Sequence, residues 1–196
     1  MKSLFCALGV VGLVALPLAL GAGDKGKKDT TDKPKYSNLT FVPTADEVID
    51  KMFELGKIAK NDVIFDLGCG DNRICFKAAK KFGCKGIGLD INPVRIREAM
   101  DWAEKTNVGL LVETRHGDAL HGVKDISDAT IVVMYMFPEF MNLWEPIAKA
   151  KLKPGVRILS HDYSFSNWEP DLTVTVKSST RDHKVHMWTV GKKKAE

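Results

Sequence analysis

Two carboxylates and a glycine turn lie close together in the first half of the chain, and their spacing could bind a nucleotide-like cofactor. An apolar run of three residues, typical of a strand buried in a parallel sheet, ends at Asp66. Gly68 and Gly70 follow, and then comes a stretch with apolar residues every four positions, which predicts a helix. A second apolar run ends at Asp90, about 20 residues past the glycine turn. Strand, glycine turn, helix, strand and acid make up half of a nucleotide-binding α/β fold.

The charges around this turn separate two classes of cofactor. Dinucleotide binders carry G-x-G-x-x-G, because the pyrophosphate needs close backbone approach at the helix N-terminus. Here Arg73 stands at the third glycine position, and Asp66 and Asp71 flank the turn with negative charge. This charge suits the sulfonium and amino groups of S-adenosylmethionine (SAM) better than a diphosphate. Asp90 is placed to accept hydrogen bonds from the two ribose hydroxyls in either class.

The same residues also have purely structural interpretations. Glycines after a strand often form only a tight turn, and the polar side chains of Asp71 and Asn72 are expected to cap the following helix. Cys69, inside the turn, is expected to be a small filler rather than a nucleophile, since no histidine lies near it in the sequence.

Two more helices are predicted from capping signals. The capping box Thr44-Ala45-Asp46-Glu47 starts a helix that ends around Gly56. Asn92-Pro93, an N-cap followed by proline at the first helical position, starts another that ends at about Thr106. Their buried faces are expected to be Val48, Met52 and Leu55 in the first and Ile96, Met100 and Ala103 in the second.

Apolar runs and alternation predict the remaining strands. Buried strands are expected at 110–114, 131–134 and 156–160, and alternating residues at 172–176 and 184–190 predict a closing antiparallel hairpin. Residues 139–151 have a helical pattern that Pro146 interrupts, so two short helices or one kinked helix are expected.

Polar and aromatic side chains follow two of these strands, at the ends where ligands bind in open parallel sheets. Tyr135 to Pro138 follow the strand at 131–134, and Tyr135 and Pro138 are candidates for the mouth of a substrate site. His161 and Asp162 follow the strand at 156–160 as the nearest polar groups, with an ordinary strand-end hydrogen-bonded pair as the alternative. From the sequence we assemble neither a nucleophilic Ser/His/Asp set nor a metal cluster.

Composition narrows the class of protein. The 196 residues are 44% hydrophobic and 28% charged, which is typical of one globular domain with a sizeable core. The net charge of +4 comes largely from lysine-rich tails, and no clustered basic face indicates a nucleic-acid partner. Apart from Cys6 near the N-terminus, three cysteines remain, an odd number that argues against a disulfide framework.

The N-terminus divides into three segments: 1–22 as a signal peptide or membrane anchor, 23–35 as a disordered linker and 36–196 as the folded domain. The apolar run at 4–22 ends in small residues, which favours a signal peptide, yet it is also long enough to cross a bilayer. Five lysines follow it and one precedes it, so a retained anchor would hold the domain in the cytoplasm.

Several motifs together resemble one group of class I SAM-dependent methyltransferases. They are FVPTADEVIDKM, DVIFDLGCGDNRI, GIGLDINP, the YMFP element, MNLWEPIAKAKLKPGVRILSHDY and the later WEP. They are similar to the family that contains the ATP synthase c-subunit lysine N-methyltransferase and its prokaryotic relatives. The resemblance covers residues 41–170, and the chain departs from it at Asn72, where glycine is more frequent, and at Phe137, where leucine is usual.

This resemblance implies a Rossmann-like α/β fold with a mostly parallel seven-stranded sheet and a C-terminal antiparallel hairpin. It implies SAM as cofactor and methyl transfer to a lysine amine of a protein, which could be a membrane protein. Asp118 would then lie near the adenine, although a solvated loop aspartate is equally expected. The candidate cofactor contacts are Asp66, Gly68, Cys69, Gly70, Asp71, Asp90, Ile91 and Asp118. The candidate catalytic residues are Tyr135, Pro138, His161 and Asp162.

Two other functions stay open at this point. The cofactor half does not reveal the acceptor, so a small-molecule methyltransferase is one alternative. A non-catalytic binding protein exported with the same fold is the second. Because SAM is made in the cytoplasm, an active enzyme is expected to be membrane-associated through residues 4–22 and to face the cytoplasm, whereas a cleaved leader would mean export.

Overall fold

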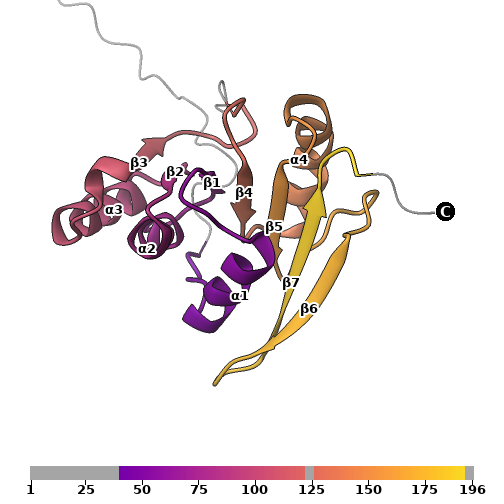
Figure 1. Cartoon of the computed structure of the whole chain (residues 1–196), viewed down its shortest axis with the longest axis horizontal. Coiled ribbons are helices and arrows are strands. Elements are labelled where there is room, and N and C mark those ends of the chain that lie inside the picture. Colours follow the sequence, from indigo (N-terminus) through magenta and orange to yellow (C-terminus); the bar gives the residue numbers. More distant parts are fainter. Residues whose placement is uncertain (1–39, 122–125, 193–196) are drawn as a thin grey trace, which may run out of the picture. The chain divides into compact units, whose positions relative to one another are not determined.

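A computed structural model describes residues 40–121 and 126–192, which form an α/β fold around one seven-stranded sheet (Figure 1). The strands lie in the order β3-β2-β1-β4-β5-β7-β6. The strands are β1 (Val63–Leu67), β2 (Lys85–Asp90), β3 (Val112–His116), β4 (Ile131–Met134), β5 (Arg157–His161), β6 (Leu172–Lys177) and β7 (Asp182–Thr189). The helices are α1 (Asp46–Gly56), α2 (Arg73–Phe82), α3 (Pro93–Lys105) and α4 (Pro138–Lys151), with a 3₁₀ turn η1 at Gly109–Leu111. The leader and linker predicted at 1–35 lie outside the described residues.

The sheet confirms the predicted mostly parallel architecture. β1 lies between β2 and β4 and runs parallel to both, with Asp66 opposite Gly88 on one side and Val133 on the other. The order therefore reverses at β1, and the crevice beyond the carboxyl ends of β1 and β4 is where ligands bind in such sheets. The predicted closing hairpin is confirmed as β6 and β7, which pair antiparallel with each other and, through β7, with β5.

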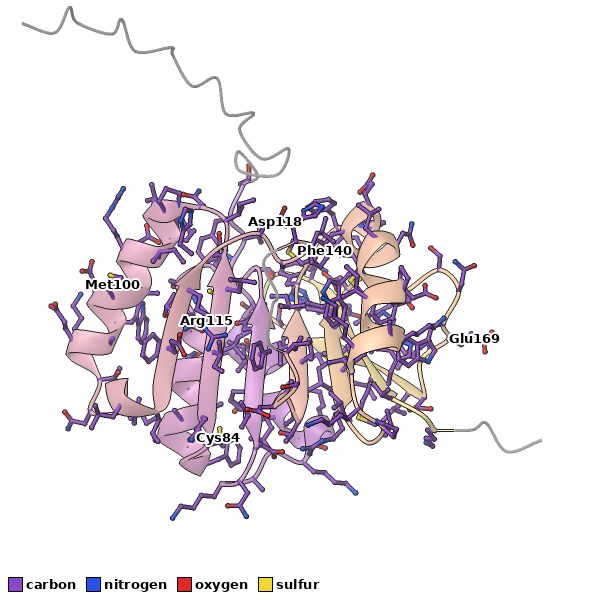
Figure 2. All side chains as sticks on the ribbon, turned by 90° about the horizontal axis from the view of Figure 1, so that it is seen from above. Cys84, Met100, Arg115, Asp118, Phe140 and Glu169 are labelled. Carbon is purple, nitrogen blue, oxygen red and sulfur yellow. The ribbon has the colours of Figure 1, made fainter. Side chains whose placement is uncertain are left out.

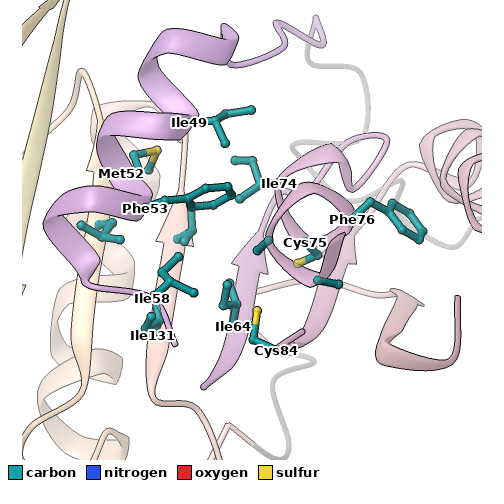
Figure 3. Packing of buried hydrophobic residues seen from close by; sticks show 14 of the residues in the cluster. Ile49, Met52, Phe53, Ile58, Ile64, Ile74, Cys75, Phe76, Cys84 and Ile131 are labelled. Carbon is teal, nitrogen blue, oxygen red and sulfur yellow. The ribbon is translucent and has the colours of Figure 1, made fainter. Parts of the chain in front are cut away.

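Helices cover the two faces of the sheet unequally. α1, α2 and α3 lie on one side in Figure 1, and α4 lies on the other. Successive strand residues alternate between the two layers, so that Ile131 packs with α1 and α2 while Val132 packs with α4. In Figure 3, Phe53 of α1 reaches toward Ile74 of α2 above the sheet.

Figure 2 shows the two ends of the parallel strands. Asp118 and Phe140 are labelled near the end where the strands finish, and Cys84 lies at the opposite end. Both Asp118 and Phe140 line a cleft at the finishing end. Among residues 40–121 and 126–192, no helix has the length and apolar character needed to cross a membrane.

Of the predicted capping residues, Asn92 is confirmed, and Thr44 and Asn72 are not. Asp71 Oδ1 does accept a hydrogen bond from the Arg73 amide, the first of α2, at 3.3 Å. The Asn92 side chain accepts a hydrogen bond from the Val94 amide, and Pro93 occupies the first turn of α3, as predicted. α1 is instead preceded by Ala45 and has no side-chain cap, because the Thr44 hydroxyl pairs with His161. Asn72 has left-handed backbone angles and sends its amide to β3, where it donates to Thr114 Oγ1 at 2.8 Å. Tertiary partners have therefore replaced local capping at both positions.

The edge of the sheet differs from the prediction in two places. β3 begins at Val112 rather than at 110, because Leu110 is fully exposed in the 3₁₀ turn η1. Met100 was predicted to be buried but is 55% exposed, and the buried face of α3 is formed by Ile96 and Ala99 (Figure 2). Next to the edge strand a helix covers only part of the sheet, so a helical repeat alone does not identify its buried side.

Two alternatives were predicted for residues 139–151, two short helices or one kinked helix, and the structure has a single helix. α4 is one helix with Pro146 inside it. Its face toward the sheet, with Phe140, Met141 and Trp144, is fully buried against β4 and β5. This packing offsets the backbone hydrogen bond that Pro146 cannot donate.

Candidate cofactor and acceptor site

A cleft opens at the carboxyl ends of β1, β2 and β4, at the predicted position. Its walls come from residues 40–44 ahead of α1, the turn after β1, the end of β2, the segment after β3 and the segment after β4. Five stretches that are far apart in the sequence thus meet at one edge of the sheet.

The glycine turn after β1 forms the floor of this cleft. Gly68 and Gly70 have φ angles of +73° and +56°, which lie in the left-handed region that favours glycine. A Cβ at Gly68 would lie 2.4 Å from Met136 Sδ, and one at Gly70 would lie 2.0 Å from the Phe41 ring. The amides of Gly68 and Cys69 donate to the Leu89 carbonyl at 2.8 and 3.1 Å, which ties the turn to β2. Both glycines are therefore required for close packing.

Asp90 ties the end of β2 to this turn. Its Oδ2 accepts from the Gly70 amide at 2.8 Å, and its Oδ1 accepts from the Asn92 amide at 2.8 Å. A carboxylate oxygen can accept more than one hydrogen bond, so each oxygen keeps capacity for a ribose hydroxyl. Gly70 does not line the cleft, and its amide acts by holding Asp90 in place.

Asp66 presents a buried carboxyl group to the cleft. It is 2% exposed, and within the described residues its Oδ2 has no hydrogen-bond partner. Burial, and then the charges of Asp90 and Asp71, raise its pKa to about 8. A cationic group of a ligand placed against this oxygen would satisfy it and favour its ionised form.

Asp71, next to the glycine turn, is paired with an arginine of the same chain. Its carboxylate forms a bidentate pair with Arg73, whose Nε and Nη2 lie 2.9 and 2.7 Å from its two oxygens. Asp71 thus flanks the turn with a carboxylate whose charge is largely matched by Arg73 within the chain. The guanidinium groups of Arg73 and Arg95 also lie 6.0 and 4.8 Å from the centre of the Phe41 ring, and so they hold residues 40–44 over the turn.

The other predicted cofactor residues, Cys69, Ile91 and Asp118, also line the cleft. Burial raises the pKa of the Cys69 thiol well above its usual range, which agrees with a filler rather than a nucleophile. Asp118 Oδ2 lies 2.8 Å from His121 Nδ1. The structure thus brings all but Gly70 of the eight candidate cofactor residues to the cleft, and their individual contacts with a cofactor stay predictions.

Among the candidate catalytic residues, Tyr135 lines the cleft and Pro138 does not. The Tyr135 ring packs on His161 with a centroid distance of 3.9 Å, and its hydroxyl lies 3.4 Å from Asp162 Oδ2. Burial, and then the charge of Asp162, raise the pKa of Tyr135. Pro138 instead opens α4, where its fixed φ suits the first helical turn.

Asp162 lies behind Tyr135 with an unusual backbone, since its φ of +63° is left-handed. Aspartate tolerates this conformation better than most residues. Burial by itself would raise the pKa of Asp162, but hydrogen bonds from Arg181 at 2.5 Å and from the Lys184 amide at 3.0 Å lower it to about 2. A permanent carboxylate therefore lies next to the Tyr135 hydroxyl.

Sequence reasoning missed His183 and Arg181 of the hairpin. His161 Nε2 and His183 Nδ1 are 2.8 Å apart, and Asp162 Oδ2 lies 3.4 and 3.7 Å from these two nitrogens. His161, Asp162 and His183 thus form a set with metal-ligand spacing, which the sequence did not reveal. The alternation of β7 indicates that His183 points inward, but only the pairing of β7 with β5 brings it to His161.

Comparisons with known proteins agree with this geometry. Residues 66–172 match the model of the ANTKMT methyltransferase domain family. The chain is 35% identical over 158 residues to a protein-lysine N-methyltransferase of Saccharolobus islandicus, covering 80% of this chain and 97% of that protein.

A second relative is the ATP synthase c-subunit lysine N-methyltransferase of Mus musculus, which is 26% identical over 140 residues. The alignment covers 69% of this chain but only 53% of that protein, so the chain spans about half the length of that relative.

Among solved structures, the chain is similar to an RNA methyltransferase from Salinibacter ruber in complex with S-adenosyl-L-homocysteine. The identity is 37%, the TM-score is 0.71, and the match covers 79% of this chain and 97% of that one. The relatives' names thus agree on methyl transfer but differ in the acceptor.

Proposed function

This chain belongs to the ANTKMT methyltransferase domain family and is a SAM-dependent methyltransferase, and we propose that its acceptor is the side-chain amine of a protein lysine. The residues of the cleft fit SAM. Asp66 offers a buried, unpartnered oxygen to a cationic group, and Asp90 offers acceptors to ribose. Gly68 leaves room where a Cβ would meet Met136.

The observation that carries the lysine proposal is the charge of the cleft. Four aspartates line it (Asp66, Asp71, Asp90 and Asp118), against two arginines. Asp71 is matched by Arg73, so the negative charge offered to a ligand comes from Asp66, which a nearby cation would ionise, and from Asp90 and Asp118. Arg73 is paired with Asp71 at 2.7 Å, and Arg95 with Glu98 at 2.5 Å, so neither is fully available to an anionic ligand. Such a cleft favours an approaching ammonium group and disfavours a phosphate backbone.

Methyl transfer to lysine needs little chemistry from the protein. SAM, when bound, would supply an electrophilic methyl group, whose carbon–sulfur bond would break as the neutral amine attacks in line and S-adenosylhomocysteine leaves. A lysine with a pKa of about 10.4 must first lose its proton, because only the neutral amine has a free lone pair. Tyr135 forms the wall where the amine would enter, and the Asp162 carboxylate beside it attracts the ammonium form. The protein therefore aligns the amine, excludes water and removes one proton.

RNA is the second candidate acceptor, because the 37% identical Salinibacter ruber structure is described as an RNA methyltransferase. RNA-binding surfaces carry a basic patch with several cations free to contact phosphates. Around this cleft, the side chains of Arg73, Arg95 and Arg181 each contact a carboxylate of the same chain. We therefore place RNA second, and a small-molecule amine remains the alternative from the sequence.

The test supplies the purified full-length chain with SAM that carries a labelled methyl group. Three acceptors are compared: a protein extract, the same extract with its lysine amines acetylated beforehand, and total RNA. We expect label in the untreated extract only, and mass spectrometry should locate it on lysine Nζ. Label in RNA, or equal labelling of both extracts, would contradict the proposal.

We also propose that the active enzyme lies at a membrane and faces the cytoplasm. Two sequence features support this: an apolar segment at 4–22 followed by five lysines, and a cofactor that is made in the cytoplasm. An anchored enzyme would meet lysines on membrane-protein loops. Fractionation with protease added to intact and to opened cells tests the placement, with the intact mass of the mature chain. An active, processed form outside the cytoplasm would refute it.

A further inference from the structure

A line of four hydrogen-bonding side chains leads from the cleft to the hairpin surface. Thr44 Oγ1, which belongs to a cleft-lining residue, lies 3.2 Å from His161 Nδ1. His161 Nε2 lies 2.8 Å from His183 Nδ1, and His183 Nε2 lies 3.2 Å from Ser178 Oγ. Ser178 is half-buried in the β6–β7 turn, and the residues that follow it are exposed. Three separate parts of the chain thus contribute to one continuous path.

The interior of this path is sealed from solvent. Thr44, His161 and His183 are 5%, 1% and 7% exposed. Each of the four groups can both donate and accept a hydrogen bond, since hydroxyls do so and a neutral imidazole donates from one nitrogen and accepts at the other. A chain of such groups can pass a proton along without any group leaving its place.

We propose that Thr44, His161, His183 and Ser178 form a proton relay that carries the proton of the substrate lysine from the cleft to solvent. This inference rests on the proposed lysine acceptor. It assigns the route of the proton that a lysine ammonium must lose before its amine can attack the methyl group. Thr44 faces the acceptor, and the other three are positioning residues that act through it.

The charges around the two imidazoles suit this role. Asp162 Oδ2 lies 3.4 Å from His161 Nε2 and 3.7 Å from His183 Nδ1. Its negative charge would stabilise a positive charge that passes between these two buried rings. Arg181 faces Asp162 from the hairpin turn, and the Tyr135 ring covers one face of His161. The side of α1 packed against the hairpin is apolar, as at Val48 and Met52.

The protonation state of His161 suits a group that passes a proton on and does not retain it. Burial lowers the pKa of His161 to about 4. The charge of Asp162 opposes this shift, and those of His183 and Arg181 add to it, so His161 is neutral at pH 7. The relay requires a tautomer with a proton on one nitrogen only, which the neutral ring provides.

The step balances in protons. The N–H bond of the lysine ammonium breaks and its proton goes to Thr44 Oγ1, while the hydroxyl proton of Thr44 goes to His161 Nδ1. His161 passes its Nε2 proton to His183 Nδ1, and His183 passes its Nε2 proton to Ser178 Oγ. Ser178 releases its hydroxyl proton to water, and rotation of the hydroxyls with return of the tautomers resets the line. No electrons are exchanged.

The test is the pH dependence of single-turnover methylation of a lysine substrate by His183→Phe and by Thr44→Val. Both remove a link, and Thr44→Val does so with nearly unchanged shape. We expect a rate loss on the order of a hundredfold at pH 7, the lower range for positioned acid–base groups. The loss should shrink as the pH approaches about 10, where free lysine is already neutral. A structural defect would lower the rate equally at every pH.

His186→Gln is the matched control, because His186 lies on the same strand and is 7% exposed like His183. It pairs with Thr173 and the Asp162 carbonyl, outside the relay, so its rate should match the parent at every pH. SAM affinity and thermal unfolding verify that each variant is folded.

Three results would overturn the relay alone. One is a parent-like rate in both relay variants while lysine is methylated, which leaves the proposed function standing. The second is a loss that does not depend on pH. The third is bound Zn²⁺ in the purified chain by elemental analysis, since a metal at His161 Nε2 and His183 Nδ1 would occupy the linking lone pairs. A parent enzyme that methylates RNA and no lysine would overturn the acceptor and the relay together.

Discussion

The proposed cofactor end and the proposed acceptor end of the cleft are built in different ways. At the cofactor end, the turn at residues 68–70 is held by backbone amides that donate to Leu89 and Asp90. At the acceptor end, Tyr135, Asp162 and Arg181 meet through side chains that come from three distant segments. The first is a short local motif with one partner strand, whereas the second exists only after the sheet and hairpin have paired.

Because of this difference, mutations at the two ends are expected to affect different quantities, SAM affinity at one end and turnover at the other. The turn and Asp90 form the part of the cleft that is proposed to hold SAM, so substitutions there should change mainly SAM affinity. Side chains at the acceptor end touch the cleft at Tyr135 and then lead away from it, so they should respond mainly in turnover. Substitutions at each end can show whether the two ends are separable in this way.

The largest effect is expected for Asp90→Ala, which should weaken SAM binding about tenfold to a hundredfold. The variant removes a charged acceptor from the ribose site, and hydrogen bonds to charged groups contribute about 1.5–3 kcal/mol. Isothermal titration calorimetry measures the loss. Asp90→Asn, which keeps one acceptor oxygen, should lose less. Unchanged SAM affinity in a folded Asp90→Ala would remove Asp90 from the ribose site.

A smaller effect, about tenfold, is expected for Tyr135→Ala on the single-turnover rate, with SAM affinity nearly unchanged. The ring packs on His161 and forms the wall of the cleft, so its loss should misplace the acceptor amine. Tyr135→Phe keeps the ring and should retain more of the rate. Equal loss of affinity and rate in Tyr135→Ala would place Tyr135 at the cofactor and break the comparison.

The smallest effect concerns the proton on Asp66. Its pKa of about 8 leaves it mostly protonated in the free protein at pH 7, and a nearby cation of SAM would lower that pKa. SAM binding at pH 7 should therefore release a fraction of a proton, measured by calorimetry in buffers of different ionisation enthalpy. The release should vanish well above pH 8, where Asp66 is already ionised, and in Asp66→Asn at any pH.

The same shift has a consequence for stability. In the unfolded chain Asp66 ionises near its ordinary pKa of 3.8, whereas in the folded chain it keeps its proton up to about pH 8. The unfolded state is therefore favoured progressively as the pH rises through this window. Denaturation of the free protein should show the parent losing more stability than Asp66→Asn between these pH values. The reverse order would place the Asp66 carboxyl in a different environment.

Local patterns were sufficient for most of the architecture and for the cofactor end. The apolar runs that end at Asp66 and Asp90 predict the ends of β1 and β2 to within one residue. The glycines predict the turn between β1 and α2. Asn92-Pro93 predicts the start of α3 correctly, because that cap bonds within its own turn. Interactions that span only a few residues leave a signature in the sequence.

Packing across long distances decided the rest. Thr44 and Asn72 are good capping residues, yet their side chains pair with His161 and with β3, because those partners lie in the folded interior. His183 reaches His161 only through the register of β7 against β5. A sequence shows which residues can donate or accept a hydrogen bond. Which partner each one takes depends on where the sheet brings the strands, and at the acceptor end that placement creates the site.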